Sequence, residues 1–371
     1  MTQSASKTVV AAAAPYGIVG LGQHLAQVVD ETAANGELEC YYASAIRPDD
    51  PFGRTVEIPI AKWLFRYTPI RFSSSWKLHV DGDLFDRAVA RRLRGKNNCF
   101  VGFNGQALHT FLKARSLGFS ELVLESATAH VRHFACQQRA ATAQFGIEGG
   151  CLNETQRRKT EHEYQLADWI VVGSEYARET FLREGVPAAK LRRRILMPHA
   201  RFQRGNTPAE ISGRFHIVSV GSISVMKGTP ILIEAFSRFR DPQARLTLIG
   251  GWGTRGMRRY MESWMARDSR IRVAAGDPLP YFQQANVCVH ASYTDGFGYA
   301  PTEALACGVP VIVSENTGMR ELVREGENGF VVPTGSWEAI LERLLEIQRG
   351  ALPVQKDPLT NPNLQPSLKA L

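Results

Sequence analysis

The sequence is short of cysteine pairs, of long apolar runs and of charge of one sign. Its six cysteines lie far apart and form no C-x-x-C pair, so neither a zinc site nor a disulfide framework is expected. No apolar run is long enough to span a bilayer, and residues 8–14 predict a first strand rather than a signal peptide. These absences favour a cytoplasmic protein.

The net charge is small, because 44 Lys and Arg stand against 36 Asp and Glu, which gives +8. Neither half of the chain concentrates the surplus, so no nucleic-acid partner is expected. Basic clusters at residues 87–96 and 192–194 are interpreted as solvated faces. Peripheral contact with the inner face of a membrane is the less favoured alternative for them.

Length and pattern predict two α/β domains, since 371 residues exceed what one hydrophobic core usually supports. Short apolar runs alternate with helical periodicity twice along the chain, which is typical of doubly wound parallel sheets. Strands are expected at residues 8–14, 40–44, 99–103, 121–125, 169–173, 215–220, 246–249, 271–275, 287–291, 309–314 and 329–332, and helices at 83–94, 106–117 and 175–184. The predicted divisions are an N-terminal Rossmann-like domain 1–196, a hinge 197–213, a C-terminal domain 214–350 and a polar tail 351–371.

The most informative stretch is TDGFGYAPTEALACGVPVIVS, residues 294–314. Asp295 follows a strand, and Glu303 lies eight positions later, in the first turn of a helix that Pro301 is expected to open. The turn between the two acids, Gly296-Phe297-Gly298, offers backbone amides to sugar hydroxyls or phosphate oxygens. A carboxylate such as Glu303 can accept two ribose hydroxyls. A plain turn with solvated acids is, however, the commoner meaning of such spacing.

A second stretch, VSVGSISVMKG at residues 218–228, places Lys227 just before a helix whose first position is expected to be Pro230. A lysine beside a helix N-terminus can neutralise a diphosphate.

Two weaker signals lie in the first half. Gly17, Gly20 and Gly22 form no clean G-x-G-x-x-G, so a turn that packs the next helix is an equally good interpretation. His130 follows a predicted strand, with His133 as the less favoured candidate, although a lone loop histidine is more often a surface residue.

Residues 294–314 resemble the carboxylate-x7-carboxylate signature of family 4 retaining glycosyltransferases of the bacterial exopolysaccharide type. Asp295 stands in the first acid position, where Glu is usual, and Glu303 in the second. The resemblance implies that Glu303 holds the nucleotide ribose. It also implies that Asp295, Gly296, Phe297 and Gly298 hold the donor sugar.

The same resemblance extends to the other stretches. It implies that Lys227 clamps the diphosphate, while Ser222 stands where the family usually has an arginine; Arg255 or Arg258 is a candidate replacement. It further implies that His130 contacts the donor sugar. Gly20 and Gly22 are then expected near the donor phosphates and the acceptor.

The resemblance implies the GT-B arrangement, in which two Rossmann-like domains face each other across a deep cleft that closes about the hinge. The implied reaction moves a hexosyl group, with retention, from a nucleoside diphosphate sugar to a glycan or lipid-linked acceptor, without a metal or other cofactor. Two alternatives stay open. Ser222 and Asp295 motivate a catalytically weak nucleotide-sugar-binding subunit, and the two-domain pattern also suits a sugar-nucleotide epimerase or an NAD-dependent dehydrogenase.

Overall fold

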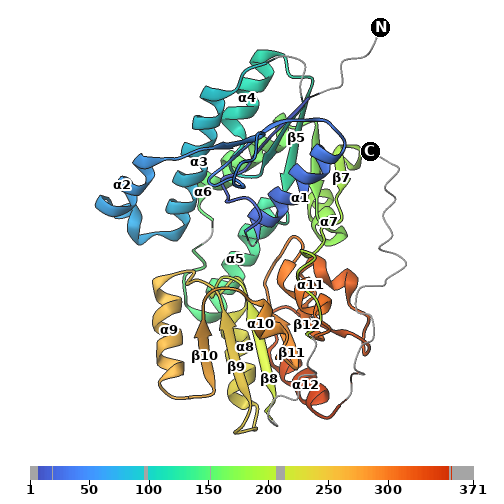
Figure 1. Cartoon of the computed structure of the whole chain (residues 1–371). Helices are drawn as coiled ribbons and strands as arrows, with labels where there is room; N and C mark the ends of the chain where they lie inside the picture. The colour runs from blue at the N-terminus through green and yellow to red at the C-terminus, as the bar shows by residue number, and fades with distance from the viewer. Residues whose placement is uncertain are drawn as a thin grey trace. The chain divides into compact units, whose positions relative to one another are not determined.

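The computed structural model describes residues 7–18, 20–95, 99–150, 152–205, 214–350 and 352. The chain divides into two compact units, each shown in Figure 1. Unit 1 comprises Met1–Ala135, Cys151–Gly173 and Arg178–Leu196; unit 2 comprises Cys136–Gly150, Ser174–Ala177 and Met197–Leu371. Of the predicted hinge, residues 206–213 lie outside the described residues, and so does the predicted tail apart from residue 352.

Unit 1 is built on a parallel sheet of seven strands in the order β3-β2-β1-β4-β5-β6-β7. The strands are β1 (Thr8–Ala11), β2 (Leu38–Ala43), β3 (Gly53–Thr55), β4 (Cys99–Phe103), β5 (Glu121–Ser126), β6 (Trp169–Val172) and β7 (Leu191–Arg193). The central strands β1 and β4 are buried along their whole length, because helices cover both faces of such a sheet. The winding direction reverses between β1 and β4, which makes that pair the topological switch point of the sheet.

The helices of this part of the chain are α1 (Leu21–Ala34), α2 (Pro59–Tyr67), α3 (Ser74–Arg92), α4 (Leu108–Leu117), α5 (Val131–Phe145), α6 (Glu154–Leu166) and α7 (Glu175–Arg183), with short 3-10 turns η1 (Pro69–Phe72) and η2 (Ala188–Lys190). The helix predicted at 83–94 begins earlier, because the Ser73 hydroxyl accepts a hydrogen bond from the Trp76 amide and caps α3. A buried cluster on β1, β2, β4 and α1 forms the core here: Val10, Ala12, Ala14, Leu25, Val28, Val29, Leu38, Tyr41, Ala43, Cys99, Val101 and Phe103.

Unit 2 repeats the plan with six parallel strands in the order β10-β9-β8-β11-β12-β13. They are β8 (His216–Val220), β9 (Arg245–Ile249), β10 (Ile271–Ala274), β11 (Val287–His290), β12 (Val311–Ser314) and β13 (Gly329–Val332). The connecting helices are α8 (Thr229–Arg238), α9 (Arg255–Met265), α10 (Leu279–Phe282), α11 (Tyr299–Ala306) and α12 (Trp337–Gln348), with a 3-10 turn η3 (Gly318–Leu322). The switch point lies between β8 and β11.

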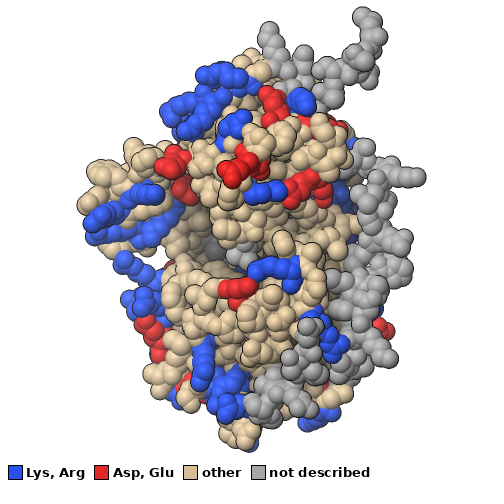
Figure 2. Space-filling view, viewed as in Figure 1, with Lys and Arg blue, Asp and Glu red and all other residues tan. Residues whose placement is uncertain are grey.

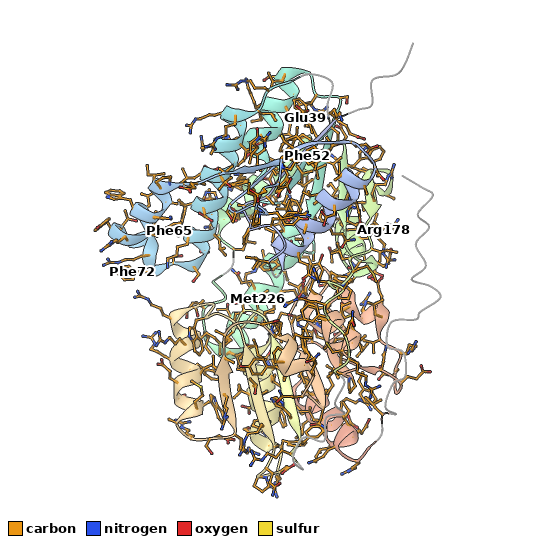
Figure 3. All side chains as sticks on the ribbon, in the orientation of Figure 1. Glu39, Phe52, Phe65, Phe72, Arg178 and Met226 are labelled. Carbon is orange, nitrogen blue, oxygen red and sulfur yellow. The ribbon has the colours of Figure 1, made fainter. Side chains whose placement is uncertain are left out.

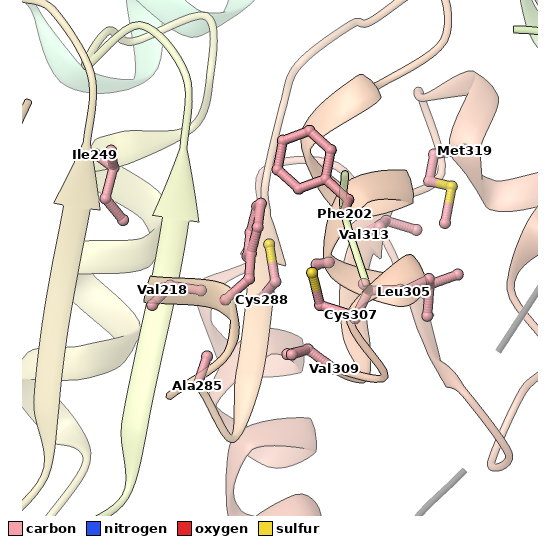
Figure 4. Close-up of a cluster of buried hydrophobic side chains, with 13 residues drawn as sticks. Phe202, Val218, Ile249, Ala285, Cys288, Leu305, Cys307, Val309, Val313 and Met319 are labelled. Carbon is pink, nitrogen blue, oxygen red and sulfur yellow. The ribbon is translucent and has the colours of Figure 1, made fainter. Parts of the chain in front are cut away.

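The core beside this second switch point is dense and apolar. Figure 4 shows Phe202, Val218, Cys288, Leu305 and Val313 from four elements and one loop packed together. Two doubly wound parallel sheets with helices confirm the predicted α/β fold class. Across the described residues, no helix combines the length and the apolar character needed to cross a bilayer.

Candidate functional site

The loops that follow β8 and β11 bring Lys227 and Asp295 into contact. The Lys227 Nζ lies 2.5 Å from Oδ2 of Asp295, and Nε2 of His290 lies 2.9 Å from the same oxygen. Both loops leave the carboxyl ends of the two strands that flank the switch point of the unit 2 sheet. In doubly wound proteins this position holds the ligand.

The charges of this cluster follow from its burial. Burial opposes ionisation of Asp295, but the Lys227 ammonium and the hydrogen bond with His290 outweigh it and hold the pKa of the carboxyl well below its ordinary value. Burial lowers the pKa of His290, although Asp295 acts in the opposite direction. At neutral pH the histidine is therefore neutral and donates its Nε2 proton to a carboxylate. The Lys227 side chain is 33% exposed, so an anion can approach it from solvent.

The Lys227 loop is fixed by a glycine and a serine. Gly228 has a φ of +67°, and a Cβ atom there would lie 1.9 Å from the Ala291 carbonyl oxygen, so only glycine fits. The Ser224 hydroxyl accepts from the Lys227 amide at 3.2 Å. The sequence predicted Pro230 as the first residue of this helix. The helix begins instead at Thr229, so Pro230 is its second residue. Lys227 therefore lies two residues before the first residue of α8, near the positive end of the helix dipole.

The loop after Asp295 is tied down by its backbone. The Asp295 amide donates to the Asn316 carbonyl and the Asp295 carbonyl accepts from the Gly318 amide, so this loop runs beside the start of η3. The carbonyl oxygens of Gly296, Phe297 and Gly298 accept from the hydroxyls of Ser174, Thr317 and Thr302, respectively. Gly298, with a φ of +98°, caps α11. The loop predicted to hold the donor sugar is therefore rigidly placed beside Asp295.

The position of Glu303 corrects one detail of the prediction. The helix begins at Tyr299, two residues before Pro301, so Glu303 is its fifth residue and does not lie in the first turn. Its side chain is 1% exposed. Burial and then the nearby Glu303 charge raise the pKa of the Cys307 thiol to about 12 and that of Cys288 above its ordinary range. Glu303 is thus a buried residue of α11 that lies close to both cysteines.

Ser222 is exposed in the loop after β8, and the entry to α9 lies beside it. A parallel bridge pairs Ile223 with Trp252, and the Gly253 amide donates to the Ile223 carbonyl. This pairing brings the chain just before Arg255 next to the position where the resemblance expects an arginine. Arg258 points its Nε at Glu262, 2.8 Å away. Arg255 lies nearer along the chain to this bridge than Arg258 does.

In unit 1, the two predicted glycines differ in what surrounds them. A Cβ at Gly22 would lie 2.0 Å from the Pro15 carbonyl oxygen, so this glycine lets α1 pack closely on the preceding turn. Gly20 has a φ of +72° and open space where a Cβ would be. Of the pair, Gly20 keeps room for a ligand, whereas packing alone accounts for Gly22.

His130 is buried rather than exposed, which corrects the general expectation for a loop histidine. Its ring lies 4.9 Å from that of Tyr164 and 5.0 Å from that of Phe181. Its Nδ1 accepts from the Arg132 amide. Burial and the charge of Arg132 lower its pKa to about 4, so the imidazole is neutral at physiological pH. It also lines a cavity of about 320 Å³ together with Lys190.

A second cavity of unit 1 lies at the carboxyl ends of β1, β4 and β5 and was not predicted from the sequence. It measures about 360 Å³, and its lining mixes polar groups with apolar ones: Asn104, Gln106 and Thr128 with Leu21, Leu78, Ala127, Val131, Phe134 and Leu152. The polar loop is held by Glu163, whose carboxylate accepts from the amides of Gly105, Ala107 and Leu108. The sequence feature that could have indicated this cavity is Asn-Gly-Gln at residues 104–106, directly after the predicted strand 99–103 and at the switch point of the sheet.

The interpretation of residues 192–194 as a solvated face is wrong for Arg194. Its guanidinium lies 2.9 Å from the carboxylate of Glu125, which is 1% exposed and also contacts His24. Arg87 of the other basic cluster pairs with Asp83 on the same helix, and residue 96 lies outside the described residues. His290 was also missed, because a histidine at the end of an apolar strand carries no signal until its neighbour is known.

Comparisons with known proteins bear on the family and on the fold. The family model described as glycosyl transferases group 1 matches residues 206–351. The capsular polysaccharide biosynthesis glycosyltransferase CapM of Staphylococcus aureus is 30% identical over 155 residues, which cover 39% of this chain and 41% of CapM. The chain thus aligns with less than half the length of the curated relatives it matches.

Solved structures resemble nearly the whole chain. Sucrose-phosphate synthase from Thermosynechococcus elongatus has a TM-score of 0.70 at 20% identity, covering 93% of this chain and 90% of that one. The structure of HepE from Anabaena in complex with UDP and glucose has a TM-score of 0.64 at 15% identity, covering 93% and 92%. At these identities the likeness shows the fold, and it confirms the predicted GT-B class of two Rossmann-like domains.

Proposed function

Residues 206–351 belong to the glycosyl transferases group 1, and on this premise we propose that the chain transfers a sugar from a nucleoside diphosphate sugar to an acceptor hydroxyl. The observation that carries the proposal is the contact of Lys227 with Asp295 across the switch point of the unit 2 sheet. It puts one accessible cation and one carboxylate at the place where a doubly wound sheet binds its ligand.

Each part of the donor has a candidate partner. The ammonium of Lys227 and the N-terminus of α8 bind the diphosphate, since both carry positive charge. Glu303 binds the ribose hydroxyls, and Asp295 with Gly296, Phe297 and Gly298 binds the sugar. His130 and Gly20 of unit 1 complete the proposed donor contacts. UDP is the proposed nucleotide, which the UDP-bound HepE supports.

The proposed reaction exchanges one bond at the anomeric carbon and retains its configuration. The bond to the diphosphate oxygen breaks, the acceptor oxygen bonds on the same face, and the acceptor proton passes to the departing phosphate. Lys227 stabilises the negative charge that develops on the diphosphate. Asp295 sits where a carboxylate can orient a hexose hydroxyl and favour positive charge on the sugar ring.

We further propose that fixed positive charge takes the place of a metal ion. Asp81-Gly82-Asp83 has the spacing of a metal motif, but it lies inside α3, and the carboxylates of Asp83 and Asp86 share the ammonium of Lys159 at 2.9 Å. Lys159, together with Arg87, which pairs with Asp83 at 2.7 Å, balances the charge of these two carboxylates. Turnover that survives a chelator supports this part of the proposal, and turnover that needs added Mg²⁺ or Mn²⁺ contradicts it.

The acceptor is proposed to bind in the unit 1 cavity of about 360 Å³. Asn104, Gln106 and Thr128 supply hydrogen-bonding groups of the kind that glycan hydroxyls need. The apolar side chains on the other wall suit a lipid-linked glycan, and the likeness to CapM supports an acceptor in polysaccharide assembly.

Calorimetric titration with UDP, GDP, ADP and NAD⁺ tests the donor site. We expect UDP to bind the wild type and to bind Glu303→Gln at least tenfold more weakly, because charged hydrogen bonds contribute about 1.5–3 kcal/mol. Glu262→Gln on the exposed face of α9 is the control. Binding of NAD⁺ instead would favour a dehydrogenase, and equal binding by Glu303→Gln would remove the ribose role.

Ser222 favours one second candidate, a nucleotide-sugar-binding subunit with weak turnover. The family's usual arginine is absent there, and the Ser222 side chain is exposed to solvent. Under this alternative, Ser222→Arg raises turnover strongly from a negligible level. Under the main proposal, the wild type already turns over, and Arg255→Ala reduces UDP affinity because Arg255 supplies the second charge.

A further inference from the structure

The large hydrophobic side chains that unit 1 exposes are concentrated in one segment. Of the twelve that the described residues expose, six lie between residues 60 and 78: Ile60, Trp63, Tyr67, Phe72, Trp76 and Leu78. We call these six the aromatic face. Scattered exposed apolar residues are normal in a folded protein, whereas a gathered set marks a surface that binds something.

The face is formed by α2, η1 and the start of α3. Ile60, Trp63 and Tyr67 recur at helical spacing on α2 and are 56%, 56% and 61% exposed, while Ala61 of the same helix is buried. The apolar stripe of α2 therefore points to solvent instead of into a core. In Figure 1, α2 projects from the rest of unit 1, and Figure 3 shows Phe65 and Phe72 on this projection.

The same segment carries only positive charge. Lys62, Arg66, Arg71 and Lys77 lie between Glu57 and Asp81, and no acid separates them. Two of the guanidinium groups lie against rings of the face, since Arg66 lies 5.4 Å from the Tyr67 ring centroid and Arg71 lies 4.6 Å from that of Phe72. Figure 2 shows blue atoms on this projection at the left edge of the view.

Aromatic rings interleaved with Lys and Arg match the interface of an anionic bilayer. Trp and Tyr prefer the headgroup level, where the ring is buried and its polar atom stays wet, and Lys and Arg are attracted to anionic headgroups. We propose that the aromatic face docks unit 1 on an anionic phospholipid surface. The basic clusters first considered for such contact are less suited, because Arg87 and Arg194 are paired with acids of unit 1.

The face is continuous with the cavity described above. Leu78 is 60% exposed on the face and also lines the cavity of about 360 Å³, as do Asp81 and Gly82 one turn further along α3. A docked unit 1 therefore holds this cavity close to the headgroups, within reach of an acceptor anchored in the same bilayer. This last consequence rests on the proposed function, whereas the docking itself does not.

Vesicle flotation with the full chain tests the docking. We expect the wild type to float with vesicles of equal phosphatidylcholine and phosphatidylglycerol and not with phosphatidylcholine alone. Trp63→Ala/Tyr67→Ala and Arg66→Gln/Arg71→Gln should each reduce binding about tenfold or more. The control pair Arg183→Gln/Arg258→Gln removes the same charge from other exposed helices and should bind as the wild type does.

Four outcomes decide the proposal. Selective loss in the two face variants, with unchanged circular dichroism and unchanged UDP binding, supports it. No flotation of the wild type overturns it, as does equal loss in the control pair. A concentration-dependent dimer that Trp63→Ala/Tyr67→Ala abolishes also overturns it, because the face would then bind a second copy. Since UDP binding is measured separately, failure here is distinguishable from failure of the proposed function.

Discussion

Lys227 and Asp295 form an ion pair that joins the two strands flanking the switch point of the unit 2 sheet. They are 68 residues apart in the sequence, and each follows a different strand. The carboxylate holds the ammonium in one position while leaving part of it exposed. A diphosphate that arrives there meets a charge already in place, which reduces the ordering needed on binding.

Replacing Lys227 with Met should reduce kcat by about 100-fold or more, by analogy with the loss of one electrostatic donor at a reacting centre. The variant should also be less stable at neutral pH, because Asp295 keeps its burial but loses its cation. Steady-state kinetics with UDP-sugars and urea denaturation measure the two effects.

Arg201→Met is the matched control for Lys227→Met. It breaks a 2.8 Å ion pair with Asp277 in which both side chains are exposed, so the expected change in stability is below about 1 kcal/mol. An unchanged rate in Lys227→Met would contradict the diphosphate role, whatever happens to its stability.

Gly228→Ala should destabilise unit 2 by about 3 kcal/mol or more, because the new Cβ meets the Ala291 carbonyl in a left-handed backbone. Gly276→Ala has a positive φ as well, +104°, but open space for its Cβ, and is expected to cost about 1 kcal/mol. Urea denaturation of the two variants separates the cost of backbone strain, which both variants carry, from the cost of steric overlap, which only Gly228→Ala carries. Similar losses would show that the overlap is relieved by a shift of the loop.

The fold was predictable from the sequence wherever burial leaves an unbroken apolar run. The strands predicted at 99–103 and 329–332 match β4 and β13 at both ends. The edge strands β3 and β7 have three residues each, and most of them are polar or charged, so no apolar run marks them. Helix α2 was not predicted, although Ile60, Trp63 and Tyr67 recur at helical spacing in its sequence.

The site was predictable where a loop follows a strand and carries a charge. Lys227 and Asp295 were found on that basis, and the group 1 family model matches residues 206–351, whereas the roles of individual residues stay predictions. The pairing of Lys227 with Asp295 needed the strand order, which places β8 beside β11. The partner of Asp295 on β11, His290, needed the same knowledge. Only the fold reveals which strand ends are neighbours.

His130 should make the stability of the protein depend on pH in weak acid. Its pKa is lowered to about 4 in the folded protein, against an ordinary 6.5, so the unfolded chain binds more protons between these values. The free energy of unfolding therefore rises as the pH rises from about 4 to 6.5. Above pH 6.5 the contribution of His130 to this free energy reaches its full value of about 3 kcal/mol.

The variant His130→Phe should lose this dependence, because Phe keeps the contacts with Tyr164 and Phe181 and cannot take up a proton. Urea denaturation of wild type and variant at pH 4.5 and pH 7 measures the difference, with His199→Phe as the control at an exposed histidine of unit 2. A wild-type profile that the variant reproduces would contradict the buried, neutral state of His130. A loss of turnover without loss of UDP affinity would support its proposed contact with the sugar.

The unit 1 cavity should control acceptor binding independently of the donor. Ala127 lines it, and its backbone amide donates to the Asn104 side chain, so Ala127→Phe fills part of the 360 Å³ while keeping that hydrogen bond. We expect sugar transfer from labelled UDP-sugar to a lipid extract to fall about tenfold or more, since an obstructed pocket loses most of its contacts with the acceptor. UDP affinity should not change, because Lys227 and Glu303 of unit 2, the groups proposed to bind the diphosphate and the ribose, are untouched. Ala33→Phe on the exposed part of α1 adds the same side chain elsewhere in unit 1 and should transfer as the wild type does. Unchanged transfer by Ala127→Phe, or a loss that Ala33→Phe equals, would contradict acceptor binding in this cavity.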